Sequence, residues 1–128
     1  MITEDYVSFE TAKLLKEKGF DSECDYLYVD GDIVRAQGGK CNWNSGETLF
    51  TDYKNECSAP TLQMAMKWLR EAHNIIISIF PTIETDMIVR EDYSYAIYKN
   101  KISVYQNCSI TYEQACEAAI KYCLEKLI

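Results

Sequence analysis

The fold is decided by one stretch of the chain, Ile75-Ile76-Ile77-Ser78-Ile79-Phe80. β-Branched and aromatic side chains favour strands because they pack well on a pleated surface. Pro81 follows this run and has no backbone N–H to donate to a neighbouring strand. We therefore expect a central strand that begins at Ile75 and stops at Pro81.

The β pattern continues after Pro81. Residues 93–98 and 102–105 are rich in tyrosine, isoleucine and valine, and the short segment Lys99-Asn100-Lys101 joins them. A less regular β pattern lies at residues 87–90. Consecutive strands joined by short turns pair antiparallel. We expect an antiparallel meander that follows the Ile75 strand.

A helical pattern precedes the Ile75 strand. Ser58 can cap a helix, and Pro60 fits a first turn, where its missing N–H costs no hydrogen bond. Apolar residues then recur at the spacing of one helix face, at Leu62, Ala65, Met66, Leu69 and Ala72.

A second helical pattern follows the meander. Thr111 and Gln114 have the spacing of a capping box, and Ile110 is placed to staple onto Ala115. The buried face of this last helix is expected to comprise Ala115, Cys116, Ala119, Ile120, Cys123, Leu124 and Leu127.

The N-terminal part predicts a helix and a hairpin. Ser8 supplies a helix cap, and Gly19 supplies the left-handed residue that ends the helix. Asp30-Gly31 lies between two β-prone runs and predicts a hairpin over residues 25–36, since both turn positions tolerate positive φ. Residues 40–57 keep no sustained period and predict a long loop, with residues 48–50 as its candidate strand.

These elements predict an α+β fold, in which a mainly antiparallel sheet (the hairpin plus the C-terminal meander) packs with three helices. The chain has 128 residues, close to the usual size of one domain. No linker, internal repeat or low-complexity segment divides it. We expect a single α+β domain over residues 1–128.

The charge is acidic and unevenly distributed. The net charge is −7, with 12 acids against 6 bases in residues 1–59 and 8 against 7 in residues 60–128. Clustered Lys and Arg bind phosphate backbones, so direct binding to nucleic acid is not expected. The first residues are acidic where a secretory signal is basic, and no uncharged apolar run is long enough to cross a membrane. We expect a cytoplasmic protein.

Six cysteines occur, at positions 24, 41, 57, 108, 116 and 123. In the cytoplasm they are expected to stay reduced, and no paired Cys or His spacing indicates a zinc site. Cys116 and Cys123 fall on the buried face of the last helix, so both are expected to be core thiols. Cys41 lies in a glycine-rich loop and is expected to be alkylated first.

No catalytic constellation emerges from the sequence. His73 is the one histidine, and no family signature surrounds any thiol with which it could pair. Oxygen clusters can hold calcium or magnesium, but the spacing of the acids near the first hairpin matches no EF-hand loop. These acids are Asp21, Glu23, Asp25, Asp30 and Asp32. We predict no catalytic residue, no metal site and no cofactor.

Aromatic residues supply the candidate binding residues. The chain has ten tyrosines, and in a strand Tyr93 and Tyr95 share one face while Tyr98 lies on the other. Tyrosine combines apolar area with a polar tip, so an exposed tyrosine face can bind a partner; the alternative is that these rings fill the core. Trp43, among polar loop residues, is the second candidate, and its alternative is that the ring folds back onto the sheet.

Three segments carry a resemblance: CSAPTLQMAMKWLRE at 57–71, TYEQACEAAI at 111–120, and the opening helix at 7–20. Here the chain resembles small proteins of gut Bacteroides species and their phages. It is more distantly similar to the phage ABA sandwich domain, whose pattern covers residues 58–128. The resemblance implies helix-sheet-helix layering and an origin in a mobile element or its host. It implies no functional residues.

Three functions are compatible with these patterns. The first is a non-enzymatic accessory protein that binds another protein, or a second copy of itself, through the tyrosine-bearing sheet or the Trp43 loop. The second is a small metal-dependent hydrolase that uses the acids of the first hairpin. The third is an acidic mimic of nucleic acid. The first is favoured because the aromatic-rich composition comes without a catalytic constellation.

Overall fold

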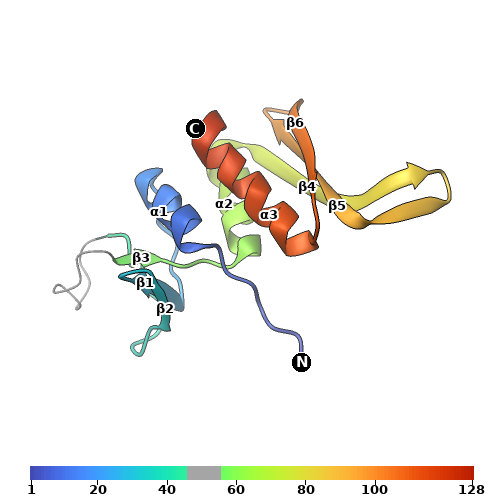
Figure 1. The fold of residues 1–128 in the computed structure, drawn as a ribbon. Coiled ribbons are helices and arrows are strands. Elements are labelled where there is room, and N and C mark those ends of the chain that lie inside the picture. Colours follow the sequence, from blue (N-terminus) through green and yellow to red (C-terminus); the bar gives the residue numbers. More distant parts are fainter. Residues whose placement is uncertain (46–55) are drawn as a thin grey trace. The chain divides into compact units, whose positions relative to one another are not determined.

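A computed structural model describes residues 1–45 and 56–128. Over these residues, helices and antiparallel strands give the predicted α+β fold, with three-stranded sheets in the orders β2-β1-β3 and β4-β5-β6 (Figure 1). The chain divides into two compact units, Met1–Ala65 and Met66–Ile128. The expectation of one domain over residues 1–128 stays a prediction.

The first unit opens with helix α1 (Phe9–Glu17), as predicted. The Ser8 hydroxyl accepts the N–H of Thr11 at 3.2 Å and caps the helix. Gly19 follows the last turn with a φ of 91°, a left-handed conformation that costs little without a Cβ atom. Local signals in the sequence therefore account for both ends of this helix.

The sheet of the first unit combines a hairpin with a short third strand. Strands β1 (Tyr26–Val29) and β2 (Asp32–Arg35) pair as predicted, and both residues of the Asp30-Gly31 turn have positive φ. Strand β3 (Glu56–Ser58) pairs with the other edge of β1. The sequence did not predict β3, because three residues that pair with a distant segment leave no local pattern. The candidate strand at residues 48–50 lies outside the described residues.

Helix α2 (Leu62–His73) begins at a different cap from the one predicted. The hydroxyl of Thr61 accepts the N–H of Met64 at 3.1 Å, whereas Ser58 belongs to β3. The predicted apolar face is buried at its first four positions, but Ala72 in the last turn is exposed.

The second unit is built on a meander of long strands, β4 (Ile75–Thr85), β5 (Ile88–Lys99) and β6 (Ile102–Ser109). The antiparallel meander is confirmed. However, β4 is an edge strand rather than a central one, and it continues through Pro81. An edge strand tolerates proline because its outer side has no neighbour that needs an N–H. The register with β5 shifts directly after Pro81, so the strand is irregular there but does not end.

Helix α3 (Tyr112–Tyr122) continues into a short π-helix, η1 (Cys123–Leu127), and contacts all three strands of the meander. The Thr111 hydroxyl accepts the N–H of Gln114 at 3.1 Å, as the predicted cap requires. The predicted face is buried from Ala115 to Leu124, and Leu127 is half-buried. Ile110 is 76% exposed, so the predicted staple onto Ala115 is wrong.

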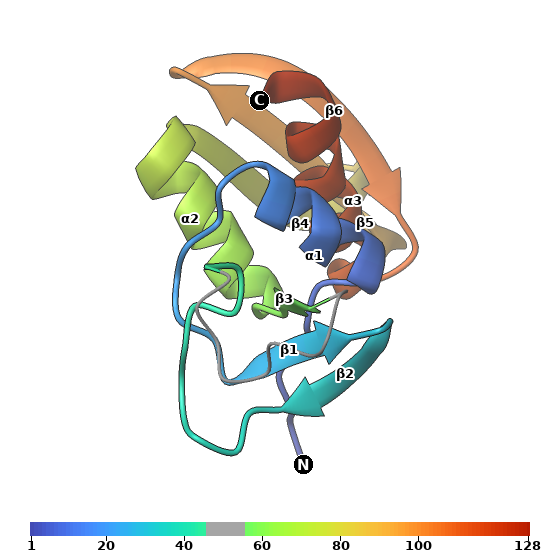
Figure 2. The ribbon, with the colours of Figure 1, turned by 90° about the vertical axis from the view of Figure 1, so that its left-hand side faces the viewer.

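Helix α3 is the helix that packs most extensively on the meander, and Figure 2 shows it next to the strands of this sheet. The helix-sheet-helix layering that the resemblance implies stays a prediction.

Over the described residues, no disulfide joins any of the six cysteines, and their side chains differ in exposure. Cys116 and Cys123 are 0% exposed, which confirms that both are core thiols. Cys41 is half-buried, whereas Cys108 on β6 is exposed. The expectation that Cys41 is alkylated first stays a prediction: Cys41 is more exposed than Cys116 and Cys123, but less exposed than Cys108.

Candidate protein-binding site

The tyrosines on one face of β5 pack against α3 instead of forming an open surface. Tyr95 is 5% exposed, and its ring lies 6.2 Å from that of Tyr105. Tyr105 in turn stacks on Tyr122 of α3, with ring centroids 3.9 Å apart. Tyr93 meets Tyr112 of α3 edge-on at 5.8 Å. These aromatic contacts join the sheet to the helix that covers it.

Of the three predicted tyrosines, Tyr95 is therefore corrected to a core residue. Burial, with a smaller contribution from Tyr105, raises the pKa of its phenol, which keeps the group neutral as a core position requires. Tyr93 and Tyr98 are half-buried and stay candidates. The alternative that the tyrosines fill the core thus accounts for the most buried member of the set.

Trp43 is also a buried residue, 6% exposed, and is corrected from an exposed loop anchor to part of the core. Its indole Nε1 donates to the carbonyl of Cys24 at 2.8 Å, and its backbone N–H donates to the Ser58 hydroxyl at 3.0 Å. The neighbouring Asn44 accepts the N–H of Ser58 and donates to the carbonyl of Phe20. Because these polar atoms of Trp43 and Asn44 are hydrogen-bonded, the large ring of Trp43 can leave water.

The acids near the first hairpin do not converge. All five are exposed, and over residues 1–45 and 56–128 no group of three His, Cys, Asp or Glu side chains could hold a metal ion. These acids are Asp21, Glu23, Asp25, Asp30 and Asp32. His73 packs edge-on against Trp68 with ring centroids 4.8 Å apart, a contact typical of a structural histidine. This arrangement lends no support to the hydrolase hypothesis, and both the hydrolase and the nucleic-acid mimic stay predictions.

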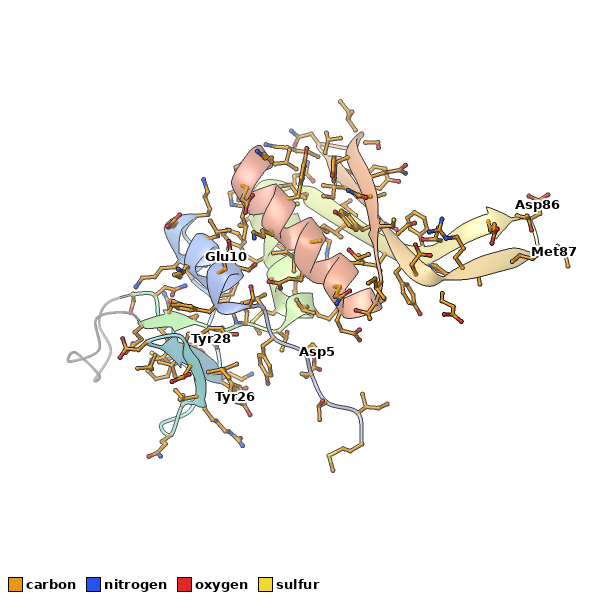
Figure 3. All side chains as sticks on the ribbon, viewed as in Figure 1. Asp5, Glu10, Tyr26, Tyr28, Asp86 and Met87 are labelled. Carbon is orange, nitrogen blue, oxygen red and sulfur yellow. The ribbon has the colours of Figure 1, made fainter. Side chains whose placement is uncertain are left out.

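An exposed apolar surface lies instead at the far end of the β4–β5 hairpin. The pairing of β5 with β6 ends at Tyr93, opposite Ser109, so β4 and β5 continue beyond that point as two strands. Every residue from 83 to 91 is exposed. We call residues 83–91 the arm. Figure 1 shows it extending beyond the sheet, and Figure 3 places Asp86 and Met87 at its end.

Four apolar side chains of the arm face solvent. Ile83 is 65% exposed, Met87 93%, Ile88 56% and Val89 58%. Ile83 and Val89 are cross-strand partners, so they share one face of the ribbon. At the root of the arm, Val89 and the exposed Ile110 line one shallow depression. Single apolar residues are common on protein surfaces, whereas several exposed apolar side chains on one ribbon make it a candidate interaction site.

The charges of the arm divide between its tip and its root. Asp86 lies beside Met87 at the tip (Figure 3), and both Glu84 and Asp86 are exposed. At the root, Arg90 forms a 2.8 Å ion pair with Asp92. The tip therefore presents an apolar side chain next to a carboxylate, which complements an apolar cleft with basic residues at its rim.

Sequence reasoning found one strand of the arm, the β pattern at residues 87–90, but it did not predict that this strand pairs with residues 83–85 beyond the sheet. The β-branched residues Ile83, Thr85, Ile88 and Val89 stand on either side of Asp86-Met87. This turn contains none of the Asn-Gly or Asp-Gly pairs that mark hairpins, and Pro81 indicated that the strand had ended.

Comparison of the chain with protein-family models, with curated proteins and with solved structures finds no match. Among the described helices, none has the length and apolar character needed to cross a bilayer. The candidate site consequently depends on the geometry of this chain alone.

Proposed function

We propose that this chain is a non-enzymatic, cytoplasmic protein-binding module that holds its partner with the arm. The observation that carries the proposal is the exposure of Ile83, Met87, Ile88 and Val89, between 56% and 93%, on a ribbon of two strands. Burying one such side chain is worth roughly 1.5–3 kcal/mol, so a partner that covers the arm gains substantial free energy. The resemblance to phage proteins supports an accessory role in a mobile element or its host.

The part of the hairpin next to the arm favours binding, because it holds the root of the arm in one conformation before a partner binds. Residues 75–81 and 93–99, which we call the base, pair in regular register, and α3 packs on this part of the sheet. At the junction with the arm, the hydroxyls of Thr82 and Ser94 lie 2.6 Å apart. A two-stranded ribbon alone is only marginally stable in water. Anchoring its root lowers the conformational entropy that binding must otherwise overcome.

The chemistry of the arm specifies the partner as a protein with an apolar cleft that accepts Met87 and with Lys or Arg at the rim. Glu84 and Asp86 supply the matching carboxylates. The net charge of −7 adds a long-range attraction to such a basic rim. Because salt screens exposed charges over about 8 Å at physiological ionic strength, association should slow as salt is raised.

Photocrosslinking tests this proposal in cells that carry the gene. A photoreactive phenylalanine derivative replaces Met87 in one protein, and in the matched control it replaces Ile33, which is 43% exposed on β2. We expect one defined protein adduct from position 87 and none of the same mass from position 33. Equal adducts from both positions, or no adduct at position 87, would contradict a binding role for the arm.

A further inference from the structure

Two cysteines face each other across a single bridge in the first unit. Cys24 and Cys41 form an isolated antiparallel β-bridge. The N–H of Cys24 donates to the carbonyl of Cys41 at 2.9 Å, and the N–H of Cys41 donates to the carbonyl of Cys24 at 3.3 Å. Residues that exchange both bonds have Cα atoms about 5.5 Å apart, within the range of roughly 4.4–6.8 Å that disulfides span. The backbone thus already brings these two residues within disulfide reach.

We propose that Cys24 and Cys41 form a reversible disulfide when the surrounding thiol pool becomes oxidising, and that this bond locks the Trp43 loop to the first unit. The carbonyl of Cys24 already accepts the indole Nε1 of Trp43 at 2.8 Å. A bond between the two sulfurs would therefore fix the loop at a point where it is already held. This redox site is independent of the arm and of the proposed function.

The two thiols differ in exposure, which assigns them different roles. Cys41 is half-buried and can be reached from solvent, whereas Cys24 is 2% exposed. In thiol-disulfide exchange the accessible thiol reacts first with the external oxidant, and a second thiol then resolves the mixed disulfide. Cys41 is the residue that reacts with the oxidant, and Cys24 is the resolving residue.

With glutathione disulfide as the oxidant, the electrons and protons balance. The Cys41 thiolate attacks one sulfur of glutathione disulfide, the S–S bond breaks, and one glutathione leaves as a thiolate that takes up a proton. The Cys24 thiolate then attacks the Cys41 sulfur of the mixed disulfide and releases the second glutathione. Two electrons and two protons pass from the cysteine pair to glutathione.

The geometry predicts a bond that forms slowly and is reduced readily. Burial raises the pKa of Cys24 to about 11, against a smaller opposing effect of the Ser58 hydroxyl, so little resolving thiolate exists at neutral pH. Opposed side chains in a sheet have Cβ atoms about 4.5–5.5 Å apart, whereas a disulfide prefers about 3.8 Å. Forming the bond therefore requires the two Cβ atoms to move closer together, and the nearby Gly38-Gly39 segment can supply part of this movement. The strain that remains makes the bond easier to reduce, as a reversible switch requires.

The experiment uses the reduced full chain in glutathione buffers of increasing oxidising strength at pH 8, followed by acid quenching, alkylation and peptide mass mapping. We expect one intramolecular link between the peptides of Cys24 and Cys41, reversed by dithiothreitol. Closing this loop should raise the melting temperature by about 5–10 °C. Cys108→Ser, which removes the exposed thiol, should leave both results unchanged.

Cys41→Ser is the deciding variant, because its side chain is only half-buried and the fold is expected to tolerate the change. It should keep the circular dichroism spectrum of the parent and lose both the link and the rise in melting temperature. The proposal is overturned if Cys41 of the parent chain carries glutathione while Cys24 stays free at every redox ratio. It is equally overturned if the only links formed involve other cysteines or join two chains.

Discussion

Strands β4 and β5 pass through two environments, and the contrast between them separates folding from binding. In the base, Ile97 is 0% exposed and Tyr95 is 5% exposed. In the arm, the same pair of strands leaves Ile83 65% and Val89 58% exposed. Both parts are antiparallel and rich in β-branched residues. The difference is that α3 packs on the base. The β propensity of the residues therefore explains why the strands form, and the packing of α3 explains which of their side chains are buried.

The largest expected difference in the free energy of unfolding is between alanine substitutions of two large apolar residues in connecting segments, Trp43 and Met87. Trp43→Ala should lower the free energy of unfolding by about 3–5 kcal/mol, because it empties a buried site and removes the hydrogen bond to Cys24. Met87→Ala, at a position 93% exposed, should change it by less than about 0.5 kcal/mol. Urea unfolding followed by circular dichroism measures both. Similar losses would mean that the arm is packed in solution.

A matched pair of isoleucines applies the same test within the second unit. Ile120→Ala removes three methyl or methylene carbons from a residue of α3 that is 0% exposed, and should cost about 2–5 kcal/mol. Ile88→Ala makes the identical change in the arm, where the loss should be within about 0.5 kcal/mol. The comparison is sensitive because the deleted atoms are the same. If Ile88→Ala proves as harmful as Ile120→Ala, the arm contributes to a core.

The exposed and buried cysteines of the second unit should also differ in their rate of alkylation. Burial raises the pKa of Cys123 from 9.0 to about 12, whereas Cys108 is exposed on β6. At pH 8, mass mapping after brief alkylation should find Cys108 modified and Cys123 modified only after unfolding.

The same raised pKa predicts the dependence of stability on pH. Below pH 9 the thiol of Cys123 is protonated in both the folded and the unfolded chain, so it contributes no pH dependence. Between pH 9 and the raised value of about 12, only the unfolded chain ionises it, and stability should fall as pH rises. Cys123→Ala should reduce this slope relative to the parent chain. An unchanged slope in the variant would show that Cys123 has no raised pKa.

Short-range signals in the sequence predicted much of the fold. Ser8, Gly19, Thr111 and the Asp30-Gly31 turn act on residues a few positions away, and the structure has each of them where the pattern indicated. Helix α3 was predicted down to its buried face because that face repeats with a clear period.

Long-range features were not predictable in the same way. The burial of Trp43 depends on Ser58 and Cys24, which are distant in the chain. Likewise, the edge position of β4 depends on which neighbour β5 accepts, and Pro81 suggests an ending where an edge strand can continue. For the candidate site, the sequence indicated aromatic residues because they are abundant, but the exposure of the β5 tyrosines depends on the packing of α3. The exposure of the arm could be recognised only from the structure, which shows the part of the hairpin on which α3 packs.

The most direct test of the arm is to measure stability and binding on one protein, the double variant Ile83→Ser and Ile88→Ser, with the photoreactive group at position 87. The unfolding free energy should stay within about 1 kcal/mol of the parent, since both side chains are exposed. The crosslinked adduct from cells should fall at least tenfold, because the apolar contacts with the partner are lost. A variant that unfolds, or one that keeps its adduct at the parental yield, would contradict the assignment of the arm as the binding surface.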